Sequence, residues 1–354
     1  MNIAVFLPNW IGDAVMATPA VRALREHYRG ARLVAVVRPY VANVFGGCNW
    51  FDDVVFLRGK SWQDGTAAVA FKLRKKGIDL AVLFPNSFRA GLAAWLGGCK
   101  RRIGYARYGR SAMLTDVLQP VRDAAGKLTP SPVIDAYNLL AVRAGCPDPG
   151  PKMTLFTTPA DDADADVIWK AAGLLRYREV ICLNPGAAFG SAKHWPAEYF
   201  AALARDLAEK RGAGVLVLCG PAERPISQEI AARARHPAVL ALGDLATPVR
   251  LDGPPLSLGL TKACVRRADL LVTTDSGPRH FAAAFDRPVV TLFGPTFIEW
   301  TETYHPRAVH LQKQVDCGPC QRRVCPLDHR CMKQLLPAEA FAAAEGLLRL
   351  GKSA

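Results

Sequence analysis

The sequence predicts an α/β protein made of two successive Rossmann-like halves. Three observations support this prediction: short apolar runs alternate with helical patterns, a proline-rich segment interrupts the alternation once, and the alternation then resumes. Alternating strands and helices are typical of a parallel sheet that carries helices on both faces. A chain of 354 residues also has room for two domains of ordinary size.

The first half of the chain begins with a strand and a helix. We expect the strand at residues 3–7 and the helix at 14–28, where apolar residues recur at helical spacing and Arg22, Arg25 and Glu26 mark the polar side. Further strands are expected at residues 33–37, 53–57, 80–84 and 102–105. Their short, nearly continuous apolar runs are typical of strands buried in a parallel sheet.

The alternation breaks at residues 146–151, where the sequence CPDPGP contains three prolines and one glycine. Such a stretch marks a linker, so we expect an N-terminal domain at 1–150, a C-terminal domain at 151–336 and a terminal helix at 337–354. The second domain should hold strands at residues 179–183, 215–219, 270–274 and 289–293 and helices at 196–210, 226–235 and 277–285. Open α/β sheets bind ligands beyond the carboxyl ends of their strands. Two such domains facing each other across a cleft form the architecture called GT-B, which we predict here.

The composition is that of a globular protein with a large positive charge. Half of the residues are apolar, and no apolar run approaches the roughly 18–20 residues that span a bilayer. The first residues lack the basic start of a signal peptide and are typical of a strand, so we expect a cytoplasmic protein. The 45 Lys and Arg residues against 31 Asp and Glu residues give a net charge of +14. This charge favours an anionic partner, which could be nucleic acid, an acidic membrane surface or a phosphorylated substrate.

The basic residues are spread along the chain. Their densest group comprises Arg101, Arg102, Arg107 and Arg110. The sequence leaves open whether these arginines form a functional patch or an ordinary solvated surface.

A first candidate motif, NWIGD at residues 9–13, directly follows the first strand. Gly12 lets another backbone approach closely, and Asp13 opens the following helix. The Asp13 side chain could be a helix N-cap, worth about 0.5–2 kcal/mol, or a general base that faces a ligand. The spacing by itself favours the cap.

A second motif, NPGAAFGSAKHWP at residues 184–196, leaves a strand in the second half and enters a helix. Gly186 and Ala187 lie in its loop, which also presents Lys193. Backbone N–H groups in such a loop, together with a lysine, suit a pyrophosphate. The spacing differs from that of the Walker motif, and an ordinary surface loop with a solvated lysine is the alternative.

A third strand-to-helix turn, TTDSGPRH at residues 273–280, has a similar form. Ser276 and Gly277 could donate backbone N–H groups to a phosphate at the start of the helix. His280 lies in the first helical turn, where it could reach the same ligand or pack in the core, and Asp275 could cap the helix. Three such loops at strand ends carry more information than any one of them alone.

Taken together, these segments resemble the signature motifs of glycosyltransferase family 9, the heptosyltransferases. The resemblance extends from the first strand to about residue 295 and includes PNSF at 85–88, RIGY at 102–105, KHWP at 193–196 and DRP at 286–288. Within the family, the NSF segment and the NPGA loop resemble the type II members most. The resemblance implies an inverting transfer of heptose from ADP-L-glycero-β-D-manno-heptose to the inner core of lipopolysaccharide.

The resemblance also assigns roles to residues. It implies that Asp13 is the catalytic base and that Lys193 holds the donor diphosphate and contributes to catalysis. The implied donor site further includes Gly12, Gly186, Ala187, Glu223, Asp275, Ser276, Gly277 and His280, and the implied acceptor site includes Asn86, Ser87 and Arg89. We expect no cofactor or metal in catalysis, because we find no Asp-x-Asp pair at a strand end that would bind a metal diphosphate. The acidic run at residues 162–166 is instead expected on a solvated helix face.

The expected partners are an ADP-sugar donor, a lipid-linked anionic core oligosaccharide and, through peripheral contact, the inner face of the cytoplasmic membrane. One alternative is a related transferase that uses another nucleotide sugar, because Ala188 departs from the acidic residue common in relatives and residues 245–258 resemble an insertion. A second alternative is a basic nucleic-acid-binding protein with a zinc knuckle, although the chain lacks clustered basic and aromatic motifs. A nicotinamide-dependent oxidoreductase is disfavoured, because no Gly-x-Gly-x-x-Gly follows the first strand of either half.

Four of the ten cysteines are clustered near the C-terminus: Cys317, Cys320, Cys325 and Cys331, with His329 among them. The first pair has the Cys-x₂-Cys spacing of a zinc knuckle, and ligation of a structural zinc by four cysteines or by three cysteines and the histidine is chemically reasonable. Free or paired thiols are an equally favoured interpretation. The six isolated cysteines are expected to behave as small apolar residues in a reducing compartment.

Overall fold

The structure is a computed structural model that describes residues 1–59, 65–186, 189–245, 251 and 255–350. It divides into two compact units, Met1–Phe156 with Glu299–Tyr304 and Thr157–Ile298 with His305–Ala354. The linker that was expected at residues 146–151 lies a few residues before the point where the first unit ends. The short segment Glu299–Tyr304 returns to the first unit, although it is far from it in sequence.

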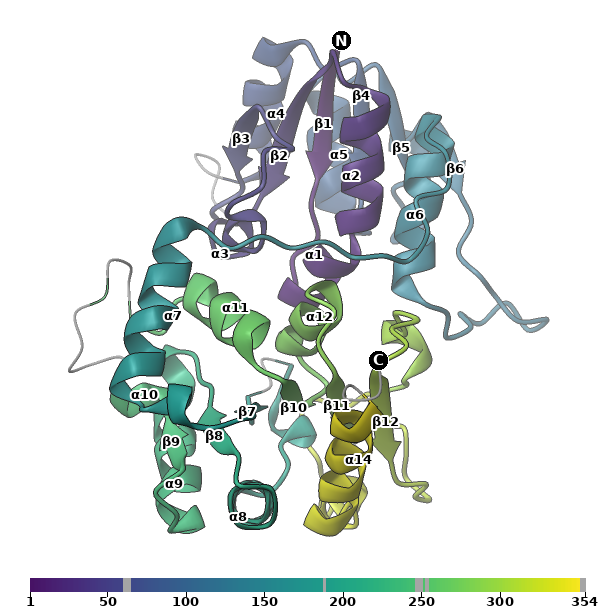
Figure 1. Ribbon diagram of the computed structural model, residues 1–354. Coiled ribbons are helices and arrows are strands. Elements are labelled where there is room, and N and C mark those ends of the chain that lie inside the picture. Colours follow the sequence, from purple (N-terminus) through teal and green to yellow (C-terminus); the bar gives the residue numbers. More distant parts are fainter. Residues whose placement is uncertain (60–64, 187–188, 246–250, 252–254, 351–354) are drawn as a thin grey trace. The chain divides into compact units, whose positions relative to one another are not determined.

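In the described residues, the first unit contains a six-stranded parallel sheet with the order β3-β2-β1-β4-β5-β6 (Figure 1). The strands are β1 (Asn2–Phe6), β2 (Arg32–Val37), β3 (Asp53–Phe56), β4 (Leu80–Leu83), β5 (Arg101–Tyr105) and β6 (Asp116–Leu118). The strand order reverses between β1 and β4, and the central β1 is almost wholly buried. The five strands that the sequence predicts here are confirmed to within one residue at each end. Strand β6 was not predicted, because three partly exposed residues carry no clear pattern.

Helices cover both faces of this sheet. They are α1 (Ile11–Met16), α2 (Thr18–His27), α3 (Pro39–Ala42), α4 (Thr66–Lys76), α5 (Phe88–Leu96) and α6 (Val133–Ala144). Helices α2 and α6 pack together on one face, and α4 and α5 pack together on the other (Figure 1). The prediction of one helix at residues 14–28 was wrong, because Pro19 lacks the N–H that would continue α1. Thr18 Oγ1 instead donates to the backbone O of Val15 at 2.7 Å, and α2 starts afresh.

The second unit repeats the same topology. Its described residues form a six-stranded parallel sheet with the order β12-β11-β10-β7-β8-β9. The strands are β7 (Val180–Asn184), β8 (Gly214–Val217), β9 (Val239–Ala241), β10 (Leu270–Thr274), β11 (Val289–Phe293) and β12 (Ala308–Gln312). Here the order reverses between β7 and β10, and both strands are fully buried. The four strands predicted in this half are confirmed to within two residues.

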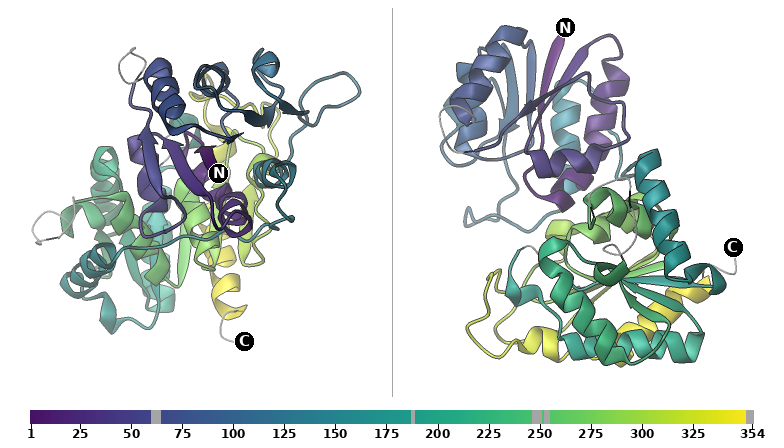
Figure 2. Two further views of the ribbon diagram at one scale, coloured as in Figure 1. Left: turned by 90° about the horizontal axis from the view of Figure 1, so that it is seen from above. Right: turned by 90° about the vertical axis from the view of Figure 1, so that its left-hand side faces the viewer.

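The helices of the second unit again lie on both faces of the sheet (Figure 2). They are α7 (Pro159–Ala171), α8 (Ala197–Arg211), α9 (Arg224–Ala234), α10 (Leu242–Leu245), α11 (Leu258–Arg267), α12 (Gly277–Ala284), α13 (Arg330–Lys333) and α14 (Pro337–Leu350). Within the described ranges, none of the chain's helices has the length and apolar character needed to cross a membrane. The segment expected to be an insertion, residues 245–258, lies largely outside the described residues.

The prediction that the acidic start of α7 is a solvated face was only partly right, because the side chain of Asp166 is 73% exposed but Asp164 is buried. Asp164 is only 3% exposed. On either side of it, Asp162 pairs with Arg266 at 3.3 Å and Asp166 pairs with Arg267 at 2.5 Å, both from α11. The acidic run is therefore complementary to a basic helix of the same unit, which the local sequence pattern does not reveal.

Candidate functional site

The carboxyl ends of the strands beside each order reversal hold most of the residues that the sequence singled out. In the first unit, α1 begins at Ile11 and Asp13 is its third residue, while Trp10 occupies the N-cap position without a side-chain cap. The interpretation of Asp13 as the N-cap is therefore wrong, because the helix starts three residues earlier than expected, at Ile11 and not at Ala14. The carboxylate is half-buried in the first turn, where the helix dipole favours its charged form. Burial, and then the charge of nearby Asp13, raise the pKa of Tyr137 in α6 well above its usual value.

The predicted acceptor residues follow β4, next to β1. Ser87 is the N-cap of α5, and its Oγ accepts a hydrogen bond from the backbone N of Ala90 at 3.3 Å. Arg89 is exposed in the first turn of the same helix. Asn86 turns in another direction, because its Oδ1 accepts a hydrogen bond from Arg110 Nη2 at 3.1 Å. The three residues thus lie at one strand end but face different surroundings.

The burial of Arg110 was not predicted from the sequence. This arginine was grouped with Arg107 on a basic stretch, yet its side chain is 0% exposed. Its Nε donates to the backbone O of Tyr105 at 3.0 Å, and its Nη1 donates to the backbone O of Pro85. Burial, and then the charge of Arg107, lower its pKa to about 10, so the guanidinium remains charged at neutral pH. The charge is held by three neutral oxygens, and two of them, Pro85 O and Asn86 Oδ1, belong to the loop that follows β4.

A cavity of about 220 Å³ opens at the carboxyl ends of β1 to β4 in the first unit. Leu7, Arg38 and Leu57, which follow β1, β2 and β3, form part of its lining. Ser87 and Arg89 from the predicted acceptor set line it as well, whereas Asn86 does not. Two of the three predicted acceptor residues therefore line a cavity at the sheet edge where ligands of such folds bind.

In the second unit, the loops after β7 and β10 are tied together. Asn184 Nδ2 donates to Thr273 Oγ1 at 3.1 Å and to Ser276 Oγ at 3.0 Å. Thr274 Oγ1 donates to the backbone O of Gly186 at 2.8 Å. The second and third sequence motifs are thus joined in one hydrogen-bonded structure. Ala187 and Ala188, in the same loop, lie outside the described residues.

Lys193 and Asp275 form a buried ion pair between these two loops. Lys193 is 8% exposed and Asp275 is 5% exposed. Lys193 Nζ lies 2.5 Å from Asp275 Oδ2 and donates also to the backbone O of Asp275 at 3.1 Å. The alternative of a solvated lysine on a surface loop is therefore wrong. Asp275 does not cap α12 either, because Ser276 occupies the N-cap position and starts the helix at Gly277.

Asp275 has a second cation and a hydroxyl as partners. Arg279, 2% exposed, lies 3.4 Å from Asp275 Oδ1, and Thr296 Oγ1 donates to Asp275 Oδ2 at 2.7 Å. Burial raises the pKa of Asp275, but Lys193, Arg279 and the hydrogen bonds outweigh it and lower the pKa to about 2. Neither Arg279 nor Thr296 was predicted from the sequence as a site residue. Arg279 could have been found because it lies four residues after Asp275, in the first turn of the helix that Asp275 precedes.

His280 is the buried neighbour of this group. Burial, and then the charge of Arg279, lower its pKa well below the usual value, so the ring is neutral. Its Nδ1 is buried and has no hydrogen-bond partner in the part of the chain that the structure describes. A neutral imidazole nitrogen of this kind can accept or donate one hydrogen bond to a ligand.

Glu223 lies against the β7 loop. Its Oε2 accepts a hydrogen bond from the backbone N of Gly220 at 3.0 Å. A Cβ atom placed on Gly186 would lie only 2.0 Å from Glu223 Oε1, so the carboxylate is packed directly on the glycine. The absence of a side chain at Gly186 therefore leaves the space that the carboxylate occupies.

The cysteine-rich segment packs on the same loops. Ala192 N donates to the backbone O of Arg323 at 3.0 Å, beside Lys193. All ten cysteines are free thiols, and Cys331 is the buried one of the clustered four. Among the described residues no group of three or more His, Cys, Asp or Glu side chains could hold a metal ion. The predicted zinc at Cys317, Cys320, Cys325 and Cys331 thus receives no support from the arrangement.

Comparison with known proteins shows which families and structures this chain is similar to. The model of glycosyltransferase family 9 (heptosyltransferase) matches residues 66–330. The chain is 28% identical to lipooligosaccharide heptosyltransferase 2 of Campylobacter jejuni over 99% of both chains, and 26% identical to lipopolysaccharide heptosyltransferase 2 of Escherichia coli K12 over 85% of each. The solved E. coli ADP-heptose lps heptosyltransferase II has a similar fold, with a TM-score of 0.76 at 23% identity and full coverage of both chains. The E. coli heptosyltransferase WaaC with ADP has a TM-score of 0.70 at 16% identity, with 98% of this chain and 100% of that chain covered. The predicted GT-B class of fold is confirmed.

Proposed function

The chain belongs to glycosyltransferase family 9, and on this premise we propose that it transfers heptose from an ADP-sugar to the inner core of lipopolysaccharide. The relatives named heptosyltransferase 2, which align with most of the chain, support a type II activity. The donor in this proposal is ADP-L-glycero-β-D-manno-heptose, because the related E. coli WaaC has been solved with ADP and with ADP-2-deoxy-2-fluoro heptose. A nucleic-acid-binding function is not favoured, because it would leave the strand-end loops without a role.

The observation that carries the proposal is the buried cluster of Lys193, Asp275 and Arg279. Lys193 and Arg279 both contact the carboxylate of Asp275, so two cations lie together at the carboxyl ends of β7 and β10. Ligands of open α/β sheets bind at these strand ends, and two cations in one place there suit a bound anion. The ADP diphosphate is such an anion. On binding, Lys193 would bridge Asp275 and the diphosphate.

Asp13 acts as the general base in this proposal. Its carboxylate takes the proton from the acceptor hydroxyl while that oxygen bonds to the anomeric carbon of the heptose. On the opposite side of this carbon, the bond to the diphosphate oxygen breaks and ADP leaves, which inverts the configuration. A positioned base of this kind is worth about 10²–10⁴ in rate.

The charge that develops on departing ADP is balanced by groups of the second unit. Lys193 provides an ammonium, and the backbone N–H groups of Ser276 and Gly277 lie at the start of α12. Glu223 provides a carboxylate for the ribose hydroxyls, and His280 a neutral ring nitrogen. With these groups in place, a divalent cation is not needed for the leaving group, and we expect EDTA to leave turnover unchanged.

The acceptor site is assigned to Asn86, Ser87, Arg89 and the adjacent cavity. Arg89 is exposed and positively charged, which suits an anionic core oligosaccharide. Because this acceptor is attached to lipid A, the enzyme would act in the cytoplasm at the inner face of the cytoplasmic membrane. The net charge of +14 favours contact with such an anionic surface.

The test is transfer from ADP-heptose to a truncated core acceptor, with the product identified by mass spectrometry. We expect wild-type protein to add one heptose, and Asp13→Ala to lose at least about 10²-fold in kcat while it retains its affinity for ADP. Glu26→Ala is the control, since Glu26 is an exposed acid on α2 of the same unit. Turnover of Asp13→Ala at the wild-type rate would refute the role of the base. Transfer from UDP- or GDP-sugars in preference to ADP-heptose would refute the proposed donor.

A further inference from the structure

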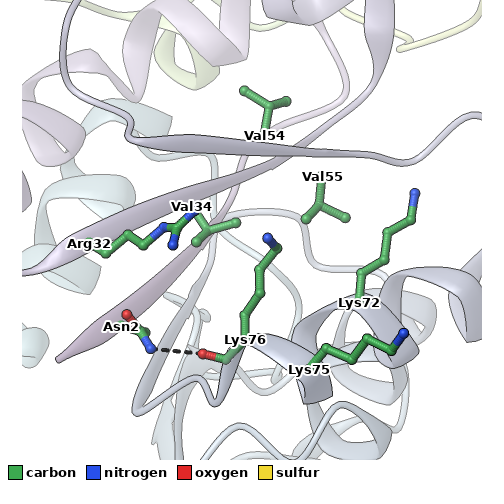
Figure 3. Close-up of a pocket in the computed structure, with 8 residues that line it drawn as sticks. All are labelled: Asn2, Arg32, Val34, Val54, Val55, Lys72, Lys75 and Lys76. Atoms are coloured by element: carbon green, nitrogen blue, oxygen red, sulfur yellow. Dashed lines mark hydrogen bonds between the residues drawn. The ribbon is translucent and has the colours of Figure 1, made fainter.

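A second hollow in the first unit lies at the opposite ends of the strands from Asp13. It has a volume of about 600 Å³ and lies where β1 and β2 begin, since Asn2 and Arg32 line it (Figure 3). Asn2 Nδ2 donates to the backbone O of Lys76 at 2.7 Å, which fastens the end of α4 to the start of β1. The proposed transfer reaction does not use this surface, because substrates of α/β sheets bind at the carboxyl ends of the strands.

The walls of this hollow are strongly basic. Arg32 from β2 and Lys72, Lys75 and Lys76 from α4 line it, and Val34 and Val55 form an apolar floor (Figure 3). Asp53 pairs with Arg32 at 3.0 Å and with Lys76 at 2.5 Å.

The charge of this surface is therefore far from balanced. Lys72 and Lys75 are exposed, and Arg74 on the same helix is exposed as well. With Arg32, Lys76 and Asp53 these residues sum to a charge of 5 − 1 = +4. A surface with such an excess of one sign attracts an extended anionic partner.

An exposed aromatic side chain stands among these cations. Phe71 is 61% exposed, although it belongs to a regular helix whose Val69, Ala70 and Leu73 are buried. Lys75 Nζ lies 4.5 Å from the centre of its ring. On the neighbouring edge strand β3, Val54 is 43% exposed. The surface thus combines accessible apolar side chains with several positively charged ones.

We infer that α4 and the edge strand β3 dock the enzyme on a bilayer that contains anionic phospholipids. An exposed Phe beside Lys and Arg residues on a helix is the composition that binds at the boundary between headgroups and acyl chains. The lysines contact lipid phosphates, the hollow receives a headgroup, and Phe71 enters the upper acyl region. Each lysine near such a surface contributes about 5-fold to the partition coefficient.

The same features fit nucleic acid less well. Proteins that bind single strands stack successive bases on several aromatic faces. Helix α4 has one aromatic residue, Phe71, and Lys75 lies over its ring. The positive charge suits either anionic partner, but the single aromatic residue favours a membrane. The test includes nucleic acid as a competing outcome.

This inference rests on the proposed function only in that a lipid-linked acceptor brings the enzyme to a membrane. The experiment is co-sedimentation of the full chain with two kinds of vesicle. One contains phosphatidylcholine alone, and the other contains about 30% phosphatidylglycerol, which makes its surface anionic. We expect binding to the anionic vesicles, and a loss of about 25-fold in the partition coefficient for Lys72→Gln with Lys75→Gln. Phe71→Ser should lose about 10-fold, since it removes the apolar group.

The matched control is Lys170→Gln with Arg178→Gln, which removes the same charge from exposed positions of the second unit. Equal losses in this control and in the α4 variant would overturn the inference, because bulk charge would then explain the binding. It would also be overturned if the α4 variant kept vesicle binding but lost binding to a random single-stranded DNA. Transfer to a soluble truncated acceptor is measured on the same variants and should be unchanged. An inactive wild-type protein that still binds vesicles would refute the proposed function and leave the docking surface intact.

Discussion

The two sheets share one strand order, but the buried charges at their carboxyl ends have different partners. In the second unit, Lys193 and Arg279 both contact the carboxylate of Asp275. In the first unit, Arg110 is just as buried, yet its described hydrogen bonds go to the neutral oxygens of Tyr105, Pro85 and Asn86. The second unit therefore holds its buried cations with an ionised carboxylate, whereas the described partners of the buried Arg110 in the first unit are neutral oxygens.

This difference in the partners of the buried cations implies two different roles for them in ligand binding. An ionic cluster that contains two cations can bind an anionic ligand, because the ligand can accept charge-assisted hydrogen bonds from them. An arginine that is held by loop carbonyls keeps those loops in one shape and has fewer donors left for a ligand. We therefore expect charge substitutions in the second unit to affect stability and donor binding together, and Arg110 substitutions to affect the acceptor loop.

The largest expected effect is that of Asp275→Asn. This change leaves Lys193 and Arg279 close together without their common carboxylate, which should destabilise the fold by about 3–5 kcal/mol. Urea unfolding at neutral pH measures this loss. Hydrogen exchange should locate it in β10 and α12 and not in β1. A loss below 1 kcal/mol would show that the cluster does not need its carboxylate.

A somewhat smaller effect is expected of Arg110→Met. The substitution keeps an apolar stem of similar length but leaves two carbonyls and Asn86 Oδ1 without their charged donor, which should cost about 2–3 kcal/mol. Because the loop of Asn86 loses its support, KM for the acceptor should rise while KM for ADP-heptose stays within about 2-fold. Steady-state kinetics with each substrate varied in turn distinguishes the two. Arg107→Met serves as the control, because Arg107 is a half-buried neighbour that contacts the exposed Tyr108.

Acid should weaken the second unit specifically. The pKa of Asp275 is lowered from 3.8 to about 2 in the folded protein. Its contribution, about 2 kcal/mol, is therefore fully present above pH 4 and is lost as the pH falls from 4 to 2. Unfolding midpoints of wild type and Asp275→Asn should converge over this window. Parallel curves for the two proteins down to pH 2 would contradict the assignment.

The smallest effect on stability is expected of Gly186→Ala. The new methyl group would meet Glu223 Oε1 at 2.0 Å, and the flexible carboxylate should move aside at a cost of about 0.5 kcal/mol or less. Its displacement should nevertheless raise KM for ADP-heptose about 10-fold, because a hydrogen bond to a charged group is lost. Gly30→Ala is the control, since nothing lies within 4 Å of its added Cβ. A normal KM in Gly186→Ala would show that Glu223 does not contact the donor.

Much of the architecture could be predicted because its signals are local. Apolar runs of strand length located β10 (Leu270–Thr274) and β11 (Val289–Phe293) to the residue. The turns NWIGD, NPGA and TTDSG were found at strand ends because glycine, proline and aspartate interrupt those runs. The failure at residues 14–28 also has a local cause, since Pro19 ends one helix and begins the next.

The sequence by itself determined the alternation of strands and helices, the two-part organisation and the loops that carry polar groups. Only the tertiary structure decided which of those groups meet. Lys193 and Asp275 are 82 residues apart, and they pair because β7 and β10 are neighbours in the sheet. Arg110 is buried and Glu223 lies on Gly186 for the same reason. Contacts between distant segments depend on strand order, and no local pattern of residue types encodes that order.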